Sequence, residues 1–304
     1  MTMQLAGRVA VITGGGSGFG REFAHLAAKA KMKVALADIE PAALAKVVDE
    51  LKGQGAEIFG RTCDVSKADH VEALAEATME TYGAVHLVFN NAGVGSGGLI
   101  WENSLSDWDW VLGVNLYGVV HGIRSFVPRM LECAKKDPSY RGHVVNTASM
   151  AGMLNAPNMG IYNVSKHAVV SLTETLYQDL RLIEAPIGAS VLCPYFVPTG
   201  ISASHRNAPS SVAGEGQTAS QKAAAVMSSK AVSSGKVTAN DVAARTFEAI
   251  LADQFYIFSH PHALGNVQTR MEDILTIRNP SDPFAARPDL RDNLRAAFAA
   301  AGRS

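Results

Sequence analysis

Three side chains in the second half of the chain have types and spacing suited to moving a proton. Tyr162 and Lys166 stand four residues apart near the start of an expected helix over about 160–183, so they share one helix face. A phenol has an unperturbed pKa near ~10, and a neighbouring ammonium group is expected to lower the pKa of Tyr162 toward neutral, as an acid and base catalyst needs. Ser149 follows an expected strand over 142–147, and its hydroxyl could hydrogen-bond a substrate oxygen. The Tyr-x-x-x-Lys spacing alone is also typical of an ordinary pair on a helix surface.

A glycine-rich turn near the start of the chain is typical of a phosphate-binding site. Gly14, Gly18 and Gly20 follow an expected strand over 8–12 and open an expected helix over about 18–30. Glycines permit a tight turn in which backbone N–H groups approach a pyrophosphate, and the helix N-terminus favours its negative charge. Such a turn can also be an ordinary strand–helix loop, but the flanking strand and helix favour a dinucleotide.

The acidic residue of a dinucleotide fold stands eighteen residues after Gly20. Asp38 ends an expected strand over 33–38, where its carboxylate can bond both hydroxyls of the adenosine ribose and would repel a 2′-phosphate. No Arg or Lys adjoins it in the sequence or stands inside the glycine turn, where Ser17 lies. We therefore expect NAD rather than NADP as the cofactor, although Asp38 could also cap the helix that begins near Pro41.

The elements that must position these residues alternate along the chain. Expected strands cover 8–12, 33–38, 57–63, 85–90, 142–147, 188–193 and 254–259, and expected helices cover about 18–30, 41–53, 67–82, 107–133, 160–183 and 238–253. Near-continuous apolar strands separated by long helices predict a parallel sheet covered on both faces. The fold class is therefore α/β, a doubly wound, mostly seven-stranded parallel sheet of Rossmann type.

We expect one dinucleotide-binding and catalytic domain over 1–264 and a C-terminal extension over 265–304. A serine- and alanine-rich stretch over about 200–236 shows no strand pattern and is predicted to be a substrate lid. The extension reads as a helix, a proline-containing stretch and a polar, alanine-rich tail.

Composition excludes several classes of function. The chain has 304 residues, 47% of them hydrophobic, and a formal net charge of -1, which argues against a strongly basic nucleic-acid surface. No apolar run reaches the ~18–20 residues of a membrane span. Cys63, Cys133 and Cys193 lack metal-ligand spacing and read as reduced thiols. We expect a cytoplasmic protein with a small-molecule substrate and no metal, nucleic acid or membrane partner.

The motifs taken together resemble the short-chain dehydrogenase/reductase family. They are, in order, Thr13-Gly14-x3-Gly18-x-Gly20, Asp64, Asn90-Asn91-Ala92-Gly93, Asn115, Ser149 and Tyr162-x3-Lys166. The similarity covers about residues 6–200 and, more loosely, 236–260. The resemblance implies that Tyr162 is the general acid and base, that Lys166 lowers its pKa and binds the nicotinamide ribose, and that Ser149 orients the substrate. Asn115 would hold a water that links Lys166 to solvent, or it is a satisfied, buried amide.

The resemblance also implies a set of cofactor contacts. They are Gly14, Ser17, Gly18, Phe19, Gly20, Asp38, Asp64, Val65, Asn91, Ala92, Gly93, Tyr162, Lys166, Pro194, Val197 and Thr199. Asp64 would bond the adenine amino group, and Val197 and Thr199 would meet the nicotinamide carboxamide. Asn90, Ala92 and Gly93 either line the adenine ribose or only support the sheet.

One departure from the family concerns the substrate side. The family usually has Pro-Gly after the sixth strand, whereas this chain has Pro194-Tyr195. Tyr195 either borders the substrate or simply packs. The expected substrate contacts are Ser149, Met150, Leu154, Tyr195 and Phe196. Because most are apolar, they favour a hydrophobic secondary alcohol or ketone.

We therefore expect an NAD-dependent oxidoreductase that interconverts a bulky or aromatic secondary alcohol and its ketone. A weaker resemblance points to bacterial members that oxidise the benzylic alcohol of lignin-derived aryl ethers. The alternatives are an NADPH-dependent ketone reductase and a non-catalytic dinucleotide sensor or scaffold. In this family the helices at about 107–133 and 160–183 pair between subunits, so a homodimer or homotetramer is expected.

Overall fold

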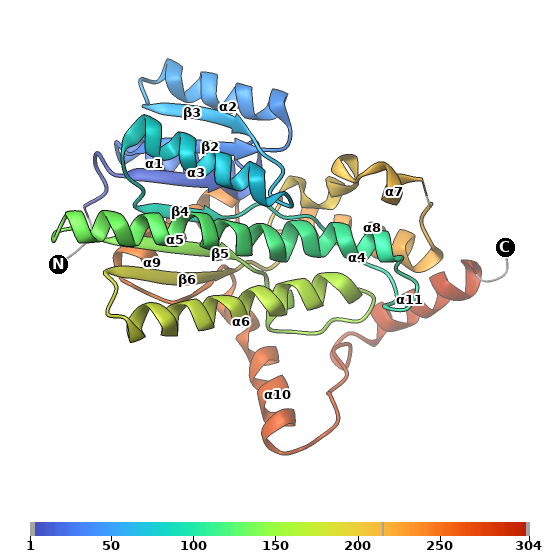
Figure 1. The fold of residues 1–304 in the computed structure, drawn as a ribbon. Coiled ribbons are helices and arrows are strands. Elements are labelled where there is room, and N and C mark those ends of the chain that lie inside the picture. Colours follow the sequence, from blue (N-terminus) through green and yellow to red (C-terminus); the bar gives the residue numbers. More distant parts are fainter. Residues whose placement is uncertain (1–3, 215, 302–304) are drawn as a thin grey trace.

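The computed structural model describes residues 4–214 and 216–301, and its centre is one parallel sheet of seven strands (Figure 1). The strand order is β3-β2-β1-β4-β5-β6-β7. The strands are β1 Val9–Thr13, β2 Lys33–Asp38, β3 Ile58–Thr62, β4 Leu87–Asn90, β5 Gly142–Thr147, β6 Ile187–Cys193 and β7 Tyr256–Phe258. The order reverses direction between β1 and β4, which places ligands at the carboxyl ends of these central strands. The expected α/β fold is confirmed.

Two layers of helices bury the two faces of the sheet. One apolar core cluster lies under α1 (Gly18–Lys29), α2 (Pro41–Gly53) and α9 (Ala239–Leu251), and another lies under α3 (Ala68–Tyr82), α5 (Gly118–Lys136) and α6 (Gly160–Leu182). Figure 1 shows α3, α5 and α6 side by side over the face of the sheet nearer the viewer. None of the helices in the described part of the chain is long and apolar enough to span a membrane.

The expected helix over 107–133 is instead three consecutive pieces. The first is α4 (Leu105–Leu112), which begins with a capping box between Ser104 and Asp107. A π-helical turn η1 follows over Gly113–Tyr117, and α5 then continues the chain. Periodicity could not reveal this turn, because one wider turn leaves the apolar pattern of the flanking helices nearly unchanged. Such turns often lie at functional sites.

The serine-rich segment over 200–236 is mostly helical. It contains the 3-10 stretch η3 (Gly200–Asn207), the short α7 (Ser210–Ala213) and α8 (Ala219–Ser233). Helix α8 begins with a capping box in which Thr218 and Gln221 satisfy each other's backbone N–H groups. Local capping therefore forms a helix here even though the apolar pattern is weak.

The C-terminal extension holds two helices. A short turn η4 (Pro261–Ala263) leads into α10 (Leu264–Leu275), which projects from the body in Figure 1. The chain then returns, and the alanine-rich tail forms α11 (Pro288–Ala301), which packs beside α8 with Leu294 buried.

Candidate active site

The glycine turn is shaped for the close approach of backbone rather than side chains. Gly14 and Gly18 have φ of 66° and 53°, in the left-handed region that favours glycine. A Cβ on Gly20 would lie 2.1 Å from the Gly14 carbonyl oxygen. The Asn91 amide braces the turn by donating to the Thr13 carbonyl at 3.0 Å. The turn is thus a rigid cradle at the start of α1, open to an anion at the helix N-terminus.

Asp38 lies beside this cradle and holds it. Its Oδ2 accepts the Gly16 N–H at 2.8 Å, and its Oδ1 accepts the Glu40 N–H at 2.9 Å. The N-cap of α2 is Glu40, so Asp38 supports the start of that helix without being its cap. A carboxylate at the tip of β2 and a glycine cradle at the tip of β1 together fit the ribose and pyrophosphate of a dinucleotide.

The residues of the Asn90-Asn91-Ala92-Gly93 segment contact both the sheet and the candidate site. Asn90 is buried, donates to Asn146 Oδ1 at 2.8 Å and faces Gly122, so the structure supports its role in the sheet rather than at the ribose. Ala92 lies against Gly14 of the cradle. A Cβ on Gly93 would lie 3.5 Å from Lys166 Nζ, so this glycine borders the candidate catalytic lysine.

Asp64 and Val65 lie at the carboxyl end of β3, near the expected adenine position. Asp64 Oδ1 accepts the backbone N–H and the hydroxyl of Ser66, at 2.9 and 2.7 Å. Val65 is buried against Gly118 of α5, and its carbonyl contacts the His121 ring at 2.9 Å. The side chain of Val65 therefore packs, and its carbonyl is engaged by His121.

Tyr162, Lys166 and Ser149 come together at the carboxyl edge of β5. Tyr162 and Lys166 lie on one face of α6 and are both buried, with Lys166 Nζ 5.7 Å from the centre of the Tyr162 ring. Lys166 donates to the Thr147 carbonyl at 3.0 Å, which fixes its ammonium group. Ser149 is the N-cap of the short turn η2 (Met150–Gly152) and accepts the Ala151 N–H at 3.1 Å.

Burial controls the titration of this group in the protein without cofactor. Burial raises the pKa of Tyr162, and a hydrogen bond with Ser149 opposes that change. Burial also lowers the pKa of Lys166 to about 8. The expected lowering of the Tyr162 pKa toward neutral is therefore wrong for this state. The reason is that desolvation of the phenolate outweighs the effect of the Lys166 ammonium group, which lies over the ring and is hydrogen-bonded to the Thr147 carbonyl.

Asn115 sits in the π-helical turn η1 and is fully buried. Its Oδ1 accepts the Val94 N–H at 2.8 Å, and its Nδ2 donates to the Val94 carbonyl and to Ser165 Oγ at 3.0 and 3.1 Å. The side chain is thus the satisfied amide that the sequence left as an alternative. It fixes the loop after β4 against α6, directly beside Lys166.

The segment after β6 closes the other side of the site. Val197 is buried in the core. A Cβ on Gly18 would lie 3.4 Å from Thr199 Cβ, which is van der Waals distance. Pro194 is buried, and its carbonyl accepts the Met150 N–H at 2.8 Å. The segment therefore lies against the glycine cradle and is hydrogen-bonded to the turn that follows Ser149.

The candidate substrate residues differ in their surroundings. Met150 is buried in the apolar cluster between the sheet and α6, so its side chain packs there, and its contact with a substrate stays a prediction. Leu154 is half-buried at the edge of that cluster. Tyr195 is 38% exposed and packs on Phe196 and His260, with ring centres 4.3 and 5.9 Å apart. Its ring therefore packs while remaining partly accessible, and its contact with a substrate stays a prediction.

Arg206 is a charged residue near the site that sequence patterns do not indicate. Arg206 lies in η3, yet it pairs with Glu40 at the start of α2, 2.6 Å from Nη2 to Oε1. Glu40 is two positions after Asp38, so the pair brings a basic group close to Asp38 although no Arg or Lys adjoins Asp38 in the sequence. The contact joins residues 166 positions apart, so no local pattern could have indicated it.

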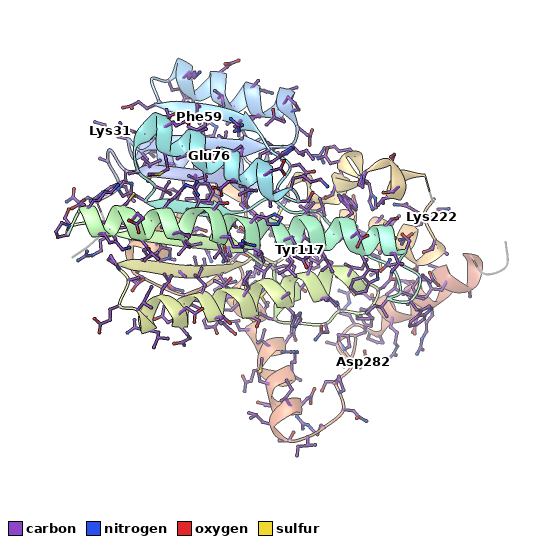
Figure 2. The ribbon with its side chains drawn as sticks, in the orientation of Figure 1. Lys31, Phe59, Glu76, Tyr117, Lys222 and Asp282 are labelled. Atoms are coloured by element: carbon purple, nitrogen blue, oxygen red, sulfur yellow. The ribbon has the colours of Figure 1, made fainter. Side chains whose placement is uncertain are left out.

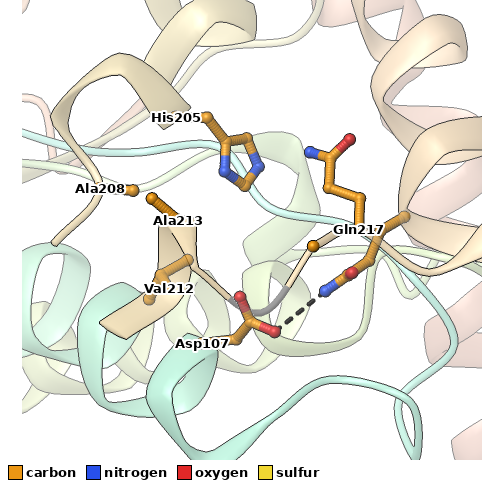
Figure 3. Close-up of a pocket in the computed structure, with 8 residues that line it drawn as sticks. Asp107, His205, Ala208, Val212, Ala213 and Gln217 are labelled. Carbon is orange, nitrogen blue, oxygen red and sulfur yellow. Dashed lines mark hydrogen bonds between the residues drawn. The ribbon is translucent and has the colours of Figure 1, made fainter. Parts of the chain in front are cut away.

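A cavity of about 240 Å³ lies where the 200–236 segment meets α4 (Figure 3). Asp107 and His205 face it with Gln217 and Gln221, and Gln221 donates to Asp107 Oδ2 at 2.9 Å. Ala208, Val212, Ala213 and Gly216 complete the lining. The segment is thus bonded to α4 while leaving space beneath it.

Comparison with known proteins places the chain among dehydrogenases. The sequence profile described as short chain dehydrogenase matches residues 8–210. A short chain dehydrogenase/reductase from Burkholderia phymatum, solved in complex with NAD, is 54% identical and has a TM-score of 0.89 over 92% of this chain and 99% of that one. A C alpha-dehydrogenase of Sphingobium sp. is 30% identical over 92% of this chain and 90% of its own length. A 1-deoxy-11-beta-hydroxypentalenate dehydrogenase of Streptomyces exfoliatus is 32% identical, with 90% of each chain covered.

These matches extend over both the cradle and the Tyr162–Lys166 helix. The similarity to C alpha-dehydrogenase also supports the weaker resemblance to aryl-ether alcohol dehydrogenases. The chain belongs to the short-chain dehydrogenase/reductase family of oxidoreductases.

Proposed function

We propose that this protein is an NAD-dependent dehydrogenase of hydrophobic secondary alcohols. The observation that carries the proposal is the buried pair of Tyr162 and Lys166 with Ser149, at the same carboxyl edge of the sheet that carries the glycine cradle and Asp38. A buried phenol, a fixed cation and a hydroxyl suit the transfer of a proton to or from an alcohol oxygen.

In the oxidative direction, Tyr162 as phenolate removes the proton of the substrate hydroxyl. Ser149 donates a hydrogen bond to the same oxygen and sets its direction toward the phenolate. Lys166, held by Thr147 and bordered by Gly93, supplies the positive charge that favours the phenolate. NAD, when bound, accepts the hydride from the carbinol carbon.

The raised pKa of Tyr162 gives the reaction a direction-dependent response to pH. A phenol that stays protonated is ready to donate a proton in ketone reduction, whereas alcohol oxidation needs the phenolate. We therefore expect the rate of oxidation to rise with pH through neutrality, while the rate of reduction stays level because the phenol remains protonated there.

The choice of NAD is supported by the carboxylate at the end of β2. Asp38 faces the cradle, where a 2′-phosphate would meet its negative charge. The guanidinium of Arg206 does not offset this charge, because it is already paired with Glu40. The similar structure from Burkholderia phymatum, which holds NAD, supports the same cofactor.

The substrate class is supported by the accessible side chains around the site. Leu154, Tyr195 and Phe196 are apolar or aromatic, and all three are at least partly exposed. The names of two relatives, a C alpha-dehydrogenase and a hydroxypentalenate dehydrogenase, agree with a bulky alcohol. We infer a bulky aromatic or alicyclic secondary alcohol.

A panel of alcohols and ketones, assayed with NAD and NADP by the absorbance of the reduced cofactor, tests the proposal. We expect higher kcat/KM for aryl and alicyclic secondary alcohols than for short aliphatic ones, and higher with NAD than with NADP. A preference for NADPH and ketones would favour the reductase alternative. Cofactor binding without turnover of any compound would favour the sensor or scaffold.

A homodimer or homotetramer remains part of the proposal. Tyr117 on η1 and Val164 on α6 are 53% and 42% exposed, and Figure 2 shows Tyr117 on the helical face nearer the viewer. Large apolar groups on such a face favour contact with a second copy. Sedimentation of a monomer at micromolar concentration would contradict this part.

A further inference from the structure

One ion pair ties the 200–236 segment to the dinucleotide-binding half of the fold. Glu40 Oε1 accepts hydrogen bonds from Arg206 Nε at 2.9 Å and from Asn207 Nδ2 at 2.8 Å, and it lies 2.6 Å from Arg206 Nη2. The pKa of Glu40 is lowered chiefly by the hydrogen bond from Arg206. Three donors from the end of η3 therefore meet one carboxylate oxygen at the start of α2.

The pair stands next to the groups that face the cofactor. The Glu40 N–H is bonded to Asp38 Oδ1. At the other end, a Cβ on Gly200 would lie 3.8 Å from both Ser17 Oγ and Arg206 Nη2. The guanidinium is thus near the glycine cradle and is joined through Glu40 to Asp38.

Arg206 also stiffens η3 itself. Its Nη1 donates to the carbonyls of Gly200 and Ala203 at 3.2 and 2.9 Å. Ser204, one turn away, accepts the Gly95 N–H at 2.9 Å and so binds η3 to the loop after β4. The stretch is therefore braced internally and is attached to the body at Glu40 on one side and at Gly95 on the other.

We propose that Glu40, Arg206 and Asn207 form a latch that holds residues 200–207 closed over the adenosine side of the bound dinucleotide and so slows its release. This inference rests on the proposed function, because it takes NAD as the cofactor. Arg206 and Glu40 act on the cofactor through the position of η3 and are positioning residues.

The exposure of the pair suits a latch that opens in every turnover. The side chains of Arg206 and Glu40 are 41% and 33% exposed. Ion pairs in such settings are weak and are exchanged readily for water. A fully buried pair would resist opening and would trap the product cofactor.

The test compares Glu40→Ala, Arg206→Ala and the double variant with Glu132→Ala. Glu40 is the N-cap of α2, but its side chain makes no capping bond within the described residues, so its loss spares that helix. Glu132 pairs with Lys135 on α5, on the other face of the sheet, and serves as the matched control. Hydrogen exchange of residues 200–207 is measured without cofactor, and the dissociation rate of NADH is measured by stopped-flow fluorescence.

We expect each single variant to exchange faster over 200–207 and to release NADH roughly fivefold faster, the lower end of usual coupling between sites. The double variant should add little to either single variant, because both remove the same contact. The control should match the parent in both measurements. Unchanged exchange and unchanged release in the Glu40 and Arg206 variants would overturn the latch.

The two proposals fail differently. A parent protein that does not bind NADH contradicts the proposed function, while hydrogen exchange in the cofactor-free protein still shows whether the pair holds η3. Faster exchange with an unchanged NADH release rate would also overturn the inference, because the pair would then be structural only.

Discussion

The substitution Gly20→Ala tests whether the glycine cradle is the cofactor site. The new Cβ would stand 2.1 Å from the Gly14 carbonyl oxygen and 2.8 Å from Asn91 Nδ2. Because carbon and oxygen normally approach to about 3.3 Å, the turn must open by about 1 Å. Both neighbours are fixed, one as backbone and the other by its bond to Thr13.

Two opposing terms set the magnitude for stability. Overpacking in a tight site costs about 1–3 kcal/mol, whereas replacing glycine by alanine within a helix gains up to about 1 kcal/mol. The free energy of unfolding should therefore fall by no more than about 3 kcal/mol, and the protein should remain folded. A displacement of about 1 Å at a binding group costs on the order of 10²-fold in function, so NAD affinity should fall at least about tenfold.

The assay is a titration of NADH fluorescence, with urea unfolding measured in parallel. Gly265→Ala in α10 is the control, because a Cβ there meets no heavy atom within 4 Å. This control should keep parental NADH affinity and lose no stability. A Gly20→Ala protein that binds NADH as tightly as the parent would refute the assignment of the cradle.

Two further predictions concern charge. Asp38→Asn keeps the shape of the side chain but removes the charge beside the cradle. The kcat/KM for NAD divided by that for NADP should therefore fall at least about tenfold. An unchanged ratio would show that Asp38 does not select the cofactor. His143 is buried on β5 against Ser190, and burial lowers its pKa from 6.5 to about 4. At a pH between these two pKa values, His143 is protonated in the unfolded chain and neutral in the folded protein. Stability is therefore fully present above pH ~6.5 and falls as the pH approaches ~4, with a loss of about 2 kcal/mol at pH ~5 from this residue. Urea unfolding at pH 7.5 and pH 5 measures this loss of unfolding free energy. The loss should be smaller in His143→Gln than in the parent protein, and the exposed control His262→Gln should lose as much as the parent.

Most of the fold followed from sequence because local and global signals agree. The bounds of β2, α2 and β5 match the expected ranges at both ends. Continuous apolar runs, a proline in the first turn of α2 and glycines at the turns all mark these elements independently. For the same reason, the location of Tyr162, Lys166 and Ser149 at one edge of the sheet could be predicted from the sequence.

The parts that could not be predicted depend on contacts between distant segments. The helix α8 needs a capping box and the cover of α11, neither of which appears in apolar periodicity. The pairing of Arg206 with Glu40 depends on how the 200–236 segment crosses the sheet edge. The pKa of Tyr162 depends on the extent of burial, which spacing along a helix does not give.

The central claim is that the phenol of Tyr162 moves the proton at a bound NAD. The most direct measurement compares Tyr162→Phe with the parent, using an aryl secondary alcohol that the parent oxidises. We predict that the variant still binds NADH and loses roughly 10²–10⁴-fold in kcat, because the acid and base group is gone. Oxidation by Tyr162→Phe at the parental rate would contradict the account.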